Sequence, residues 1–397
     1  MQINVRKFTA GIVMLAIIVF TFSYGVYAQG DITVLINGET LECSEPPIIQ
    51  EGRTFIPMRD VFEGLGARLV WNTQERRADA VYKDVLVTVL PDEGTLIKNG
   101  EIVELDAKPF IQNDRILIPL RAVAQCFGYN VIWSGRERIV SVSTDAVLKA
   151  YFLDCGQADS IFITLPDGKC MLIDAGESYF GEKLDSFIRE KGYSHIDYVV
   201  ASHPHSDHIG AMAHILENFT VGTFYMPDVV HTTKTYEKML DALENNGCSR
   251  VLISSGDTIA DGIYDVRVLS PEKAEYVRMN DYSAVIKLTH KNFSVLFSAD
   301  AEARAEGKMV DAGADLGADI LKAGHHGSAT STTEPYLDAV SPRDVIISVG
   351  EGNSYGFPSA LVMAQLNERN INVYRTDING NITVVTDGYV YVIEGDK

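Results

Sequence analysis

A histidine-rich turn that follows an apolar run restricts the fold of this chain more than any other feature. Residues 196–201 (IDYVVA) suit a buried strand, and residues 211–219 (AMAHILENF) repeat apolar side chains at helical spacing. Between these two segments lie four potential ligands: His203, His205, Asp207 and His208. Because functional sites are commonly built on loops at strand ends, the pattern predicts a layered α/β domain with a polar site at one sheet edge.

The four side chains of this turn predict metal binding. Imidazole nitrogens combined with a carboxylate suit zinc, and they also accept manganese or iron. In an H-x-H-x-D-H string, His203 and His205 can point to one metal while Asp207 and His208 point across the turn to a second. We therefore expect two divalent ions, with zinc favoured over manganese and iron. The alternative is a loop of solvated polar residues with no ligand role.

Further ligand candidates follow other apolar runs. Asp300 ends FSVLFSAD and could bridge two metals, or it could instead cap the helix expected after it. His325 and His326 follow ADILKAG, and the sequence leaves open which of them is a ligand or whether both lie on the surface. Asp174 ends MLID, where we expect it to accept a hydrogen bond from a ligand histidine and fix its tautomer.

Residues 31–143 contain an internal repeat. The segments FIPMR (55–59) and GARLVW (66–71) return as LIPLR (117–121) and GYNVIW (128–133), each 62 positions later and without a gap. Such a fixed offset indicates duplication. Each copy predicts short strands, an Asn-Gly turn and a short helix that ends at a glycine, which together make a small α+β unit.

This repeat resembles the copper amine oxidase N-terminal-like domain, which is often appended to secreted bacterial proteins as a stalk. No histidine precedes His195, so the resemblance implies no copper site. Trp71 and Trp133 end equivalent strands of the two copies, and we expect them to be core residues rather than a platform for sugars.

The first 28 residues predict a targeting segment. Arg6 and Lys7 precede a charge-free apolar stretch that runs to Ala28. This pattern is typical of a signal peptide cleaved after Ala28, and its length also suits an uncleaved membrane anchor. Either alternative predicts an extracytoplasmic protein, secreted or anchored to the outer face of the cytoplasmic membrane.

From about residue 149 the ordered motifs resemble the metallo-β-lactamase fold, and more narrowly the β-lactamase-like domain at the end of the ComEC competence family. The matching segments, in order, are DCGQADS (154–160), LIDAG (172–176), SHPHSDHIGA (202–211), FSAD (297–300), LKAGHHGS (321–328) and VYRTD (373–377). The resemblance implies an α/β fold, the metallo-β-lactamase αββα sandwich, in residues 149–397. The smaller α+β duplicated domain precedes it.

The sequence departs from that family near its C-terminal end. Phe357 and Ser359 in YGFPS occupy places where the family usually has histidines. If such a histidine contacts the substrate or protonates the leaving group, this chain lacks that aid. The family's polytopic membrane channel also has no counterpart here, so we do not expect this chain by itself to import DNA.

The resemblance implies a secreted or envelope-associated metal-dependent hydrolase, specifically a phosphodiesterase or nuclease. A hydroxide held between two metals would attack phosphorus or a carbonyl carbon. The residues expected in catalysis are Asp207, His326, Lys322 and Ser328, and those expected in a substrate loop are Asp159 and Ser160. The expected partners are a phosphodiester substrate, either nucleic acid or an envelope polymer, and the cell envelope through the repeats.

Charge and composition leave two rival interpretations open. The net charge of −20 argues against a broad nucleic-acid surface, which needs a basic face. Other esters, thioesters or amides therefore stay as alternative substrates, and so does a non-catalytic envelope-binding protein. The five cysteines include no C-x-x-C pair, which excludes a zinc knuckle and a regular disulfide framework. The oligomeric state is open.

Overall fold

The computed structural model describes residues 31–91 and 93–397, and the unit Ile32–Lys397 contains five β-sheets. The signal peptide or anchor predicted in residues 1–28 lies outside the described residues. Among the residues that are described, no helix combines the length and apolar character needed to cross a membrane. All five cysteines lie in this part of the chain, and all are free thiols.

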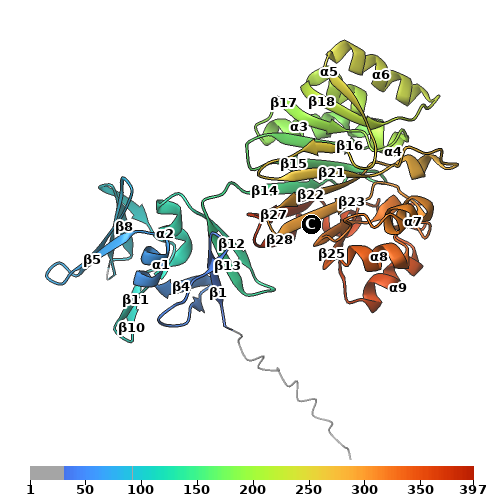
Figure 1. The fold of residues 1–397 in the computed structure, drawn as a ribbon. Helices are drawn as coiled ribbons and strands as arrows, with labels where there is room; N and C mark the ends of the chain where they lie inside the picture. The colour runs from blue at the N-terminus through green and yellow to red at the C-terminus, as the bar shows by residue number, and fades with distance from the viewer. Residues whose placement is uncertain (1–30, 92) are drawn as a thin grey trace, which may run out of the picture. The chain divides into compact units, whose positions relative to one another are not determined.

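Two stacked mixed sheets form the part of the chain that follows the repeats, which we call the lactamase block (residues 148–395) (Figure 1). The strands of the first sheet, in spatial order, are β19 (Ser249–Ile253), β18 (Thr220–Pro227), β17 (His195–Val200), β16 (Cys170–Ala175), β15 (Ser160–Thr164), β14 (Leu148–Phe152), β27 (Ile382–Thr386) and β28 (Tyr391–Gly395). Those of the second are β20 (Thr258–Ala260), β21 (Asp265–Ser270), β22 (Val285–His290), β23 (Phe293–Phe297), β24 (Ile320–Lys322), β25 (Asp344–Ile347) and β26 (Asn372–Arg375).

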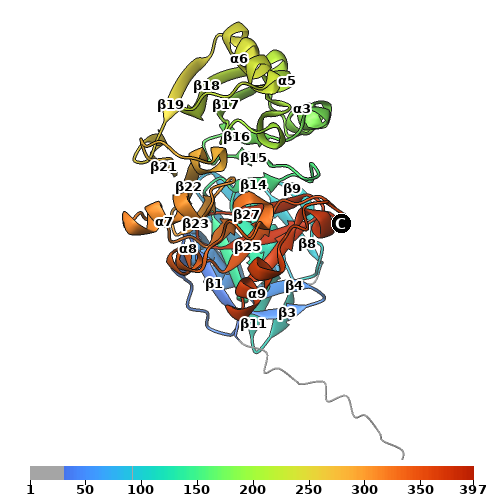
Figure 2. The same cartoon turned by 90° about the vertical axis from the view of Figure 1, so that its right-hand side faces the viewer.

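Helices cover the outer face of each sheet. The first sheet packs against α3 (Gly181–Glu190), α5 (Met212–Asn218) and α6 (Lys234–Asn246), and the second against α7 (Ala303–Asp311), α8 (Glu334–Val340) and α9 (Ala360–Glu368). Both views place α5 and α6 beside β17 and β18, and α8 and α9 beside β25 (Figure 2).

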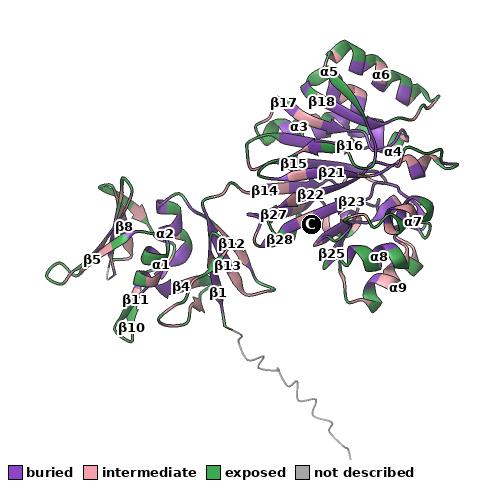
Figure 3. Ribbon diagram, viewed as in Figure 1, coloured by how far each residue is buried: buried purple, intermediate pink, exposed green. Residues whose placement is uncertain are grey.

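Alternating side chains along the strands explain this layering. In β15, Ile161 and Ile163 pack into the apolar layer between the two sheets, whereas Phe162 packs under the helices of the first sheet. Successive side chains of a strand point to opposite faces, so a strand that is apolar throughout is buried on both. The buried residues accordingly follow the strands and the inner faces of the helices (Figure 3). The predicted αββα sandwich is confirmed.

Parallel pairing brings the ends of the central strands together. β16 pairs in parallel with β17 in one sheet, and β23 pairs in parallel with β24 in the other. The carboxyl ends of parallel strands meet at the same sheet edge, where open α/β sheets commonly place their ligands. The residues that follow these four strands include most of the predicted metal ligands.

The described residues of the repeat block, 31–91 and 93–143, form three smaller sheets and two short helices. The strands, in spatial order within each sheet, are β5 (Arg68–Asn72), β6 (Arg77–Tyr82), β7 (Val85–Leu90), β8 (Thr95–Lys98) and β9 (Glu101–Glu104); β12 (Asn130–Ser134), β13 (Ile139–Ser143), β1 (Thr33–Ile36) and β2 (Glu39–Thr40); and β10 (Phe110–Gln112), β11 (Arg115–Pro119), β4 (Arg53–Pro57) and β3 (Ile48–Gln50). The helices are α1 (Met58–Gly64) and α2 (Leu120–Cys126). Both are followed by a glycine with positive φ, +78° at Gly66 and +83° at Gly128, which confirms the predicted glycine ends.

The two copies are related by an approximate two-fold rotation. β4 and β11 pair antiparallel with Ile56 opposite Ile118, its own equivalent 62 positions later. On either side, Phe55 lies opposite Pro119 and Pro57 opposite Leu117, so each copy presents the same contacts to the other. Each sheet also contains strands of both copies. In one sheet, β8 and β9 of the second copy follow β5, β6 and β7 of the first, and in another, β1 and β2 of the first copy follow β12 and β13 of the second.

The placement of the tryptophans differs from the expectation of two core residues. Trp71 is 39% exposed, so that prediction is wrong for this position. Trp133 is partly buried and packs against the core of the repeat block.

Candidate metal centre

The turn after β17 carries the densest group of polar side chains. His203 and His205 follow the strand, and a short helix, α4 (Ser206–Ile209), holds Asp207 and His208 in its single turn. The structure thus places these last two residues within a helix, whereas the sequence suggested a turn throughout. A Cβ at Gly210 would lie 2.5 Å from the backbone nitrogen of Ser178, so glycine permits this close approach.

The second sheet supplies the facing side chains. Asp300 lies three residues after β23 and does not cap α7, whose N-cap is Glu302. His325 and His326 follow β24 and adopt positive φ angles of 46° and 53°. These left-handed conformations send the two adjacent imidazoles in different directions.

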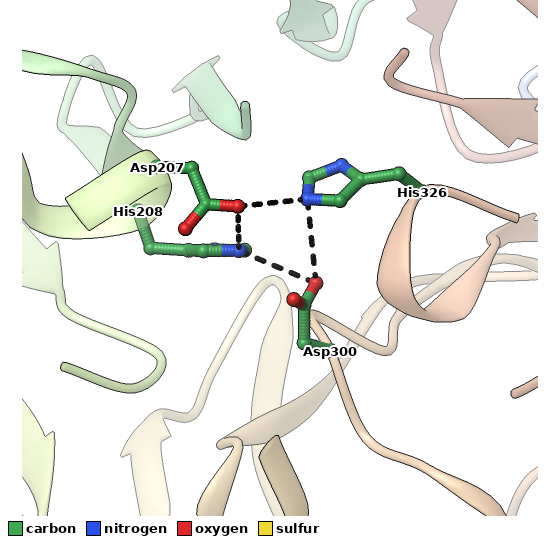
Figure 4. A group of neighbouring side chains, drawn as sticks. All are labelled: Asp207, His208, Asp300 and His326. Atoms are coloured by element: carbon green, nitrogen blue, oxygen red, sulfur yellow. Dashed lines mark hydrogen bonds and ion pairs between the residues drawn. The ribbon is translucent and has the colours of Figure 1, made fainter. Parts of the chain in front are cut away.

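Four side chains converge at one point (Figure 4). Nε2 of His326 lies 3.2 Å from Oδ2 of Asp207 and 3.7 Å from Oδ1 of Asp300. Nε2 of His208 lies 3.2 Å from Oδ1 of Asp300 and 3.8 Å from Oδ2 of Asp207. We call these four residues the first cluster; their potential ligand atoms all lie within 4.8 Å of one another.

A second cluster comprises His203, His205 and, again, Asp300. Nε2 of His203 lies 3.0 Å from Nδ1 of His205 and 3.8 Å from Oδ2 of Asp300. Asp300 therefore turns Oδ1 toward the first cluster and Oδ2 toward the second. A carboxylate that bridges two cations must have this arrangement.

The donor atoms fit divalent metal ions. Nε2 of His208 and Oδ1 of Asp300 are buried and have no hydrogen-bond partner in the described part of the chain. Buried polar atoms in native proteins almost always have partners, so two unpartnered ligand atoms at one point fit the binding of a cation. Imidazole and carboxylate donors suit zinc, manganese or iron.

The carboxylates dominate the electrostatics of the site. Burial disfavours ionised Asp300, yet His208 and His326 hold the pKa of its carboxyl well below the usual range. Burial likewise opposes ionisation of Asp207, but the same two histidines lower its pKa to about 2. Burial alone would lower the pKa of His326, whereas Asp300 and Asp159 raise it to about 10. A field that retains protons here also attracts metal cations.

Hydrogen bonds behind the clusters orient the imidazoles. Nδ1 of His208 donates to Oδ2 of Asp174 over 2.7 Å, and that carboxylate also accepts from the backbone and hydroxyl of Ser202. Nδ1 of His326 donates to the carbonyl of Ser348 over 3.0 Å. Both rings therefore present Nε2 to the first cluster. Metal-binding histidines commonly donate their other ring nitrogen to a carboxylate or a carbonyl in this way. Asp174 makes the contact predicted for it.

Lys322 and Asp159 form a buried ion pair behind His326. The Lys322 ammonium lies 2.8 Å from Oδ2 of Asp159, and its side chain has no exposed surface. Oδ1 of Asp159 lies 3.5 Å from Nδ1 of His326. Ser160 is fully buried beside this pair. These residues thus contact His326 or the core, and the structure gives Lys322 no open face toward a substrate.

His325 lies at the rim of the site, outside both clusters. Its side chain is 23% exposed, and its ring nitrogens lie 3.7 Å from Oδ2 of Asp300 and 3.3 Å from Oε1 of Glu302. Ser328, also predicted as catalytic, is buried and hydrogen-bonds through its hydroxyl to Thr330 over 3.0 Å. The structure therefore distinguishes the adjacent histidines, because only His326 contributes to a cluster.

Sequence reasoning missed a polar group around His325. Glu302 accepts from Arg278 over 2.7 Å, and the amide of Asn280 lies 3.4 Å from Nδ1 of His325. Glu302 could have been identified from the sequence because it lies two residues after Asp300 in SADAE (298–302). Arg278 and Asn280 precede β22 and carry no recognisable spacing.

The two residues that replace the family's late histidines have separate surroundings. The ring of Phe357 packs edge-on against His325, with centroids 5.5 Å apart. Ser359 caps α9, where its hydroxyl accepts from the backbone of Val362 over 3.2 Å. Phe357 thus adjoins the site, and Ser359 acts as a helix cap.

Comparisons with known proteins assign both blocks to families. The copper amine oxidase N-terminal domain matches residues 35–142, and the metallo-beta-lactamase superfamily matches residues 153–351. "ComE operon protein 3" of Bacillus subtilis is 32% identical over 247 residues, which cover 58% of this chain and 32% of that protein. "Recombination protein 2" of Haemophilus influenzae is 28% identical over 299 residues, which cover 72% of this chain and 34% of that protein.

The chain spans about a third of the length of these curated relatives. Among solved structures, the metallo-beta-lactamase fold protein YhfI from Bacillus subtilis aligns with a TM-score of 0.42 and 11% identity, covering 61% of this chain and 100% of that one. The superfamily match spans half of the sequence and includes both clusters. The chain belongs to the metallo-beta-lactamase superfamily.

Proposed function

We propose that this protein is a metal-dependent hydrolase that cleaves phosphodiester bonds at two divalent ions. His203, His205 and Asp300 would hold one ion, and Asp207, His208, Asp300 and His326 the other. The observation that carries the proposal is the division of the two Asp300 oxygens between the clusters. Members of this superfamily are metal-dependent hydrolases, which supports the reaction class.

The protein's own residues provide access and orientation. Bound divalent ions supply the acidity that makes water nucleophilic near neutral pH and polarise the phosphoryl oxygen. The side chain of Asp207 is 28% exposed whereas that of Asp300 is 2% exposed, so the substrate approaches on the Asp207 side. Asp207 can accept a proton from the attacking water there. Lys322 and Asp159 act as positioning residues through His326.

His325 is the imidazole placed to meet the substrate rather than a metal. It lies at the rim, partly exposed and close to Asp300. We give it the role of donating a proton to the leaving oxygen. Phe357 packs on one edge of its ring and limits how far that ring can turn.

Phosphodiesters are favoured among hydrolysable substrates because two similar proteins are named "Recombination protein 2" and "Competence protein ComA". The net charge of −20 favours a short nucleic acid or a small envelope phosphodiester over a long duplex. We place the activity outside the cytoplasm, in a secreted or membrane-anchored protein whose repeat block contacts the envelope. The apolar stretch before Ala28 supports that location.

Hydrolysis of bis(p-nitrophenyl) phosphate by the whole protein, with added zinc or manganese, tests this function. Turnover should require metal and should fall sharply in His205→Ala. His195→Ala is the matched control, because His195 is exposed and lies outside both clusters, where its ring hydrogen-bonds to Thr220 and lies 3.8 Å from Asp197. If the protein binds two metals but hydrolyses only p-nitrophenyl acetate, its substrate is a carboxylic ester rather than a phosphodiester.

A further inference from the structure

The repeat block contains a cleft that both copies complete. This cleft, of about 360 Å³, is lined by Trp71 and Arg59 of the first copy and by Ile111 and Arg115 of the second. Asp114 also lines it. We call it the Trp71 cleft.

A second cleft, of about 170 Å³, repeats this composition with the copies exchanged. It is lined by Trp133 and Arg121 of the second copy and by Ile49 and Arg53 of the first. Each of these residues is 62 positions from its counterpart in the Trp71 cleft. Asp106 supplies the carboxylate here. We call it the Trp133 cleft.

The two-fold pairing of β4 with β11 explains why there are two equivalent clefts. The hairpin β3–β4 of the first copy reaches the tryptophan strand of the second, and the hairpin β10–β11 of the second reaches that of the first. Residues of both copies line each cleft. The duplication therefore produces a pair of sites in addition to a core.

Each cleft also contains one arginine that is free to bind a ligand. Arg115 and Arg121 are exposed and form no ion pair with any residue in 31–91 or 93–397. Arg53 pairs with Asp106, and Arg59 lies 3.8 Å from Glu63. An unpaired guanidinium beside an aromatic ring in a concave site is a group that recognises planar anions such as carboxylates.

We propose that each cleft binds one acidic sugar residue of a glycan. The apolar face of the sugar ring would pack on the indole, and its carboxylate would accept paired hydrogen bonds from Arg115 or Arg121. The carboxylate of Asp114 or Asp106 would accept from sugar hydroxyls. Two arginines and one aspartate give each cleft a net positive charge, although the whole chain is acidic.

The two-fold relation between the copies also determines how a strand can bind. Two-fold related clefts run in opposite directions, so a glycan strand with a defined direction cannot occupy both in the same manner. Each protein molecule should therefore bind two separate strands, one in each cleft. This inference concerns the repeat block and is independent of the proposed hydrolase activity.

Tryptophan fluorescence provides a direct test, because Trp71 and Trp133 are the only tryptophans in the sequence. The whole protein is titrated with tetramers of galacturonate, of hyaluronate and of N-acetylmuramate-containing cell-wall glycan. At least one should change the emission with a stoichiometry of two. The methyl ester of the galacturonate tetramer, which is neutral, should bind at least about tenfold more weakly than the free acid if that acid binds.

Variants assign the signal to each cleft. In Trp133→Phe the remaining emission reports the Trp71 cleft, and adding Arg115→Ala should weaken binding about tenfold. Trp71→Phe with Arg121→Ala tests the other cleft in the same way. Arg68→Ala is the matched control, since Arg68 is an exposed arginine that lines neither cleft. Bis(p-nitrophenyl) phosphate hydrolysis and circular dichroism should be unchanged in every variant.

Three outcomes would overturn the inference. The first is unchanged emission with every acidic tetramer up to about 10 mM. The second is a loss in Arg115→Ala and Arg121→Ala no larger than in Arg68→Ala. The third is tighter binding of a single-stranded DNA tetramer than of any acidic glycan, which would assign the clefts to nucleic acid.

Discussion

The two blocks of this chain differ in whether they bury ionisable side chains. Within the described part of the repeat block, no Asp, Glu, His, Lys or Arg is buried, and its core is apolar. The lactamase block buries a group of ionisable side chains at the strand ends: Asp159, Asp174, His203, His208, Asp300, Lys322 and His326. Burying ionised groups costs stability unless they are paired or coordinate metals. The lactamase block thus buries the ionisable side chains of its candidate metal centre, whereas the repeat block has its charged side chains at the surface.

The largest expected effect comes from the shared carboxylate. Asp300→Asn keeps the shape of the side chain but removes the charge on which both clusters depend. We expect hydrolysis of bis(p-nitrophenyl) phosphate to fall by about 10³-fold or more. Arg121→Ala in the repeat block should leave this rate unchanged. Comparable rates for Asp300→Asn and the native protein would show that hydrolysis does not depend on the buried Asp300 carboxylate.

The next effect concerns the ion pair behind His326. Lys322→Ala leaves the Asp159 carboxylate buried without its partner, which should destabilise the fold by about 3–5 kcal/mol. Chemical denaturation followed by circular dichroism measures this change. The double variant Lys322→Ala with Asp159→Ala should recover part of the loss. A cost below about 1 kcal/mol for the single variant would show that the pair is not desolvated.

Ile56→Ala tests the apolar core of the repeat block. Ile56 is fully buried at the centre of the two-fold pairing, so its truncation should cost about 2–5 kcal/mol. Val70→Ala is the control, because Val70 is largely exposed and should change stability by less than about 0.5 kcal/mol. Metal content should be unaffected by either change. Loss of metal in Ile56→Ala would mean that the two blocks are coupled.

The metal clusters and the glycan clefts should also differ in pH dependence. His326, whose pKa is raised to about 10 without metal, and His208, whose pKa is raised well above its usual value, must lose protons to bind a cation. The bound state carries fewer protons, so metal affinity should fall about tenfold per pH unit for each displaced proton as the pH decreases from 8 to 6. Calorimetry in buffers of different ionisation enthalpy counts these protons.

Glycan binding in the repeat block depends on arginines that stay charged throughout this range. Its affinity should therefore stay constant between about pH 6 and pH 8, where the metal affinity changes. A metal affinity equally insensitive to pH would contradict protonated histidines in the metal-free clusters.

Much of the site was predictable because its residues follow apolar strands in the sequence. The H-x-H-x-D-H spacing and the strand-end Asp300 indicated two ligand groups before their distances were known. The choice between His325 and His326 was not predictable, because it depends on two consecutive left-handed residues that no spacing encodes. Nor could the pairing of Lys322 with Asp159 be predicted, since the two lie far apart in the sequence and on different sheets.

The fold of the repeat block was predictable only in part. The offset of 62 residues revealed the duplication and the equivalent helices. It could not show that each sheet combines strands of both copies, because a repeat offset does not specify which copy a strand pairs with. Nor could it show that Trp71 lines a cleft completed by residues of the other copy.

Metal content is the most direct test of the central claim that the lactamase block holds two ions around one shared carboxylate. The purified protein would be saturated with zinc or manganese, freed of excess metal, and analysed by atomic emission beside Asp300→Asn. The account predicts two equivalents in the native protein and a marked loss in the variant. No metal in the native protein, or two equivalents retained in Asp300→Asn, would contradict it.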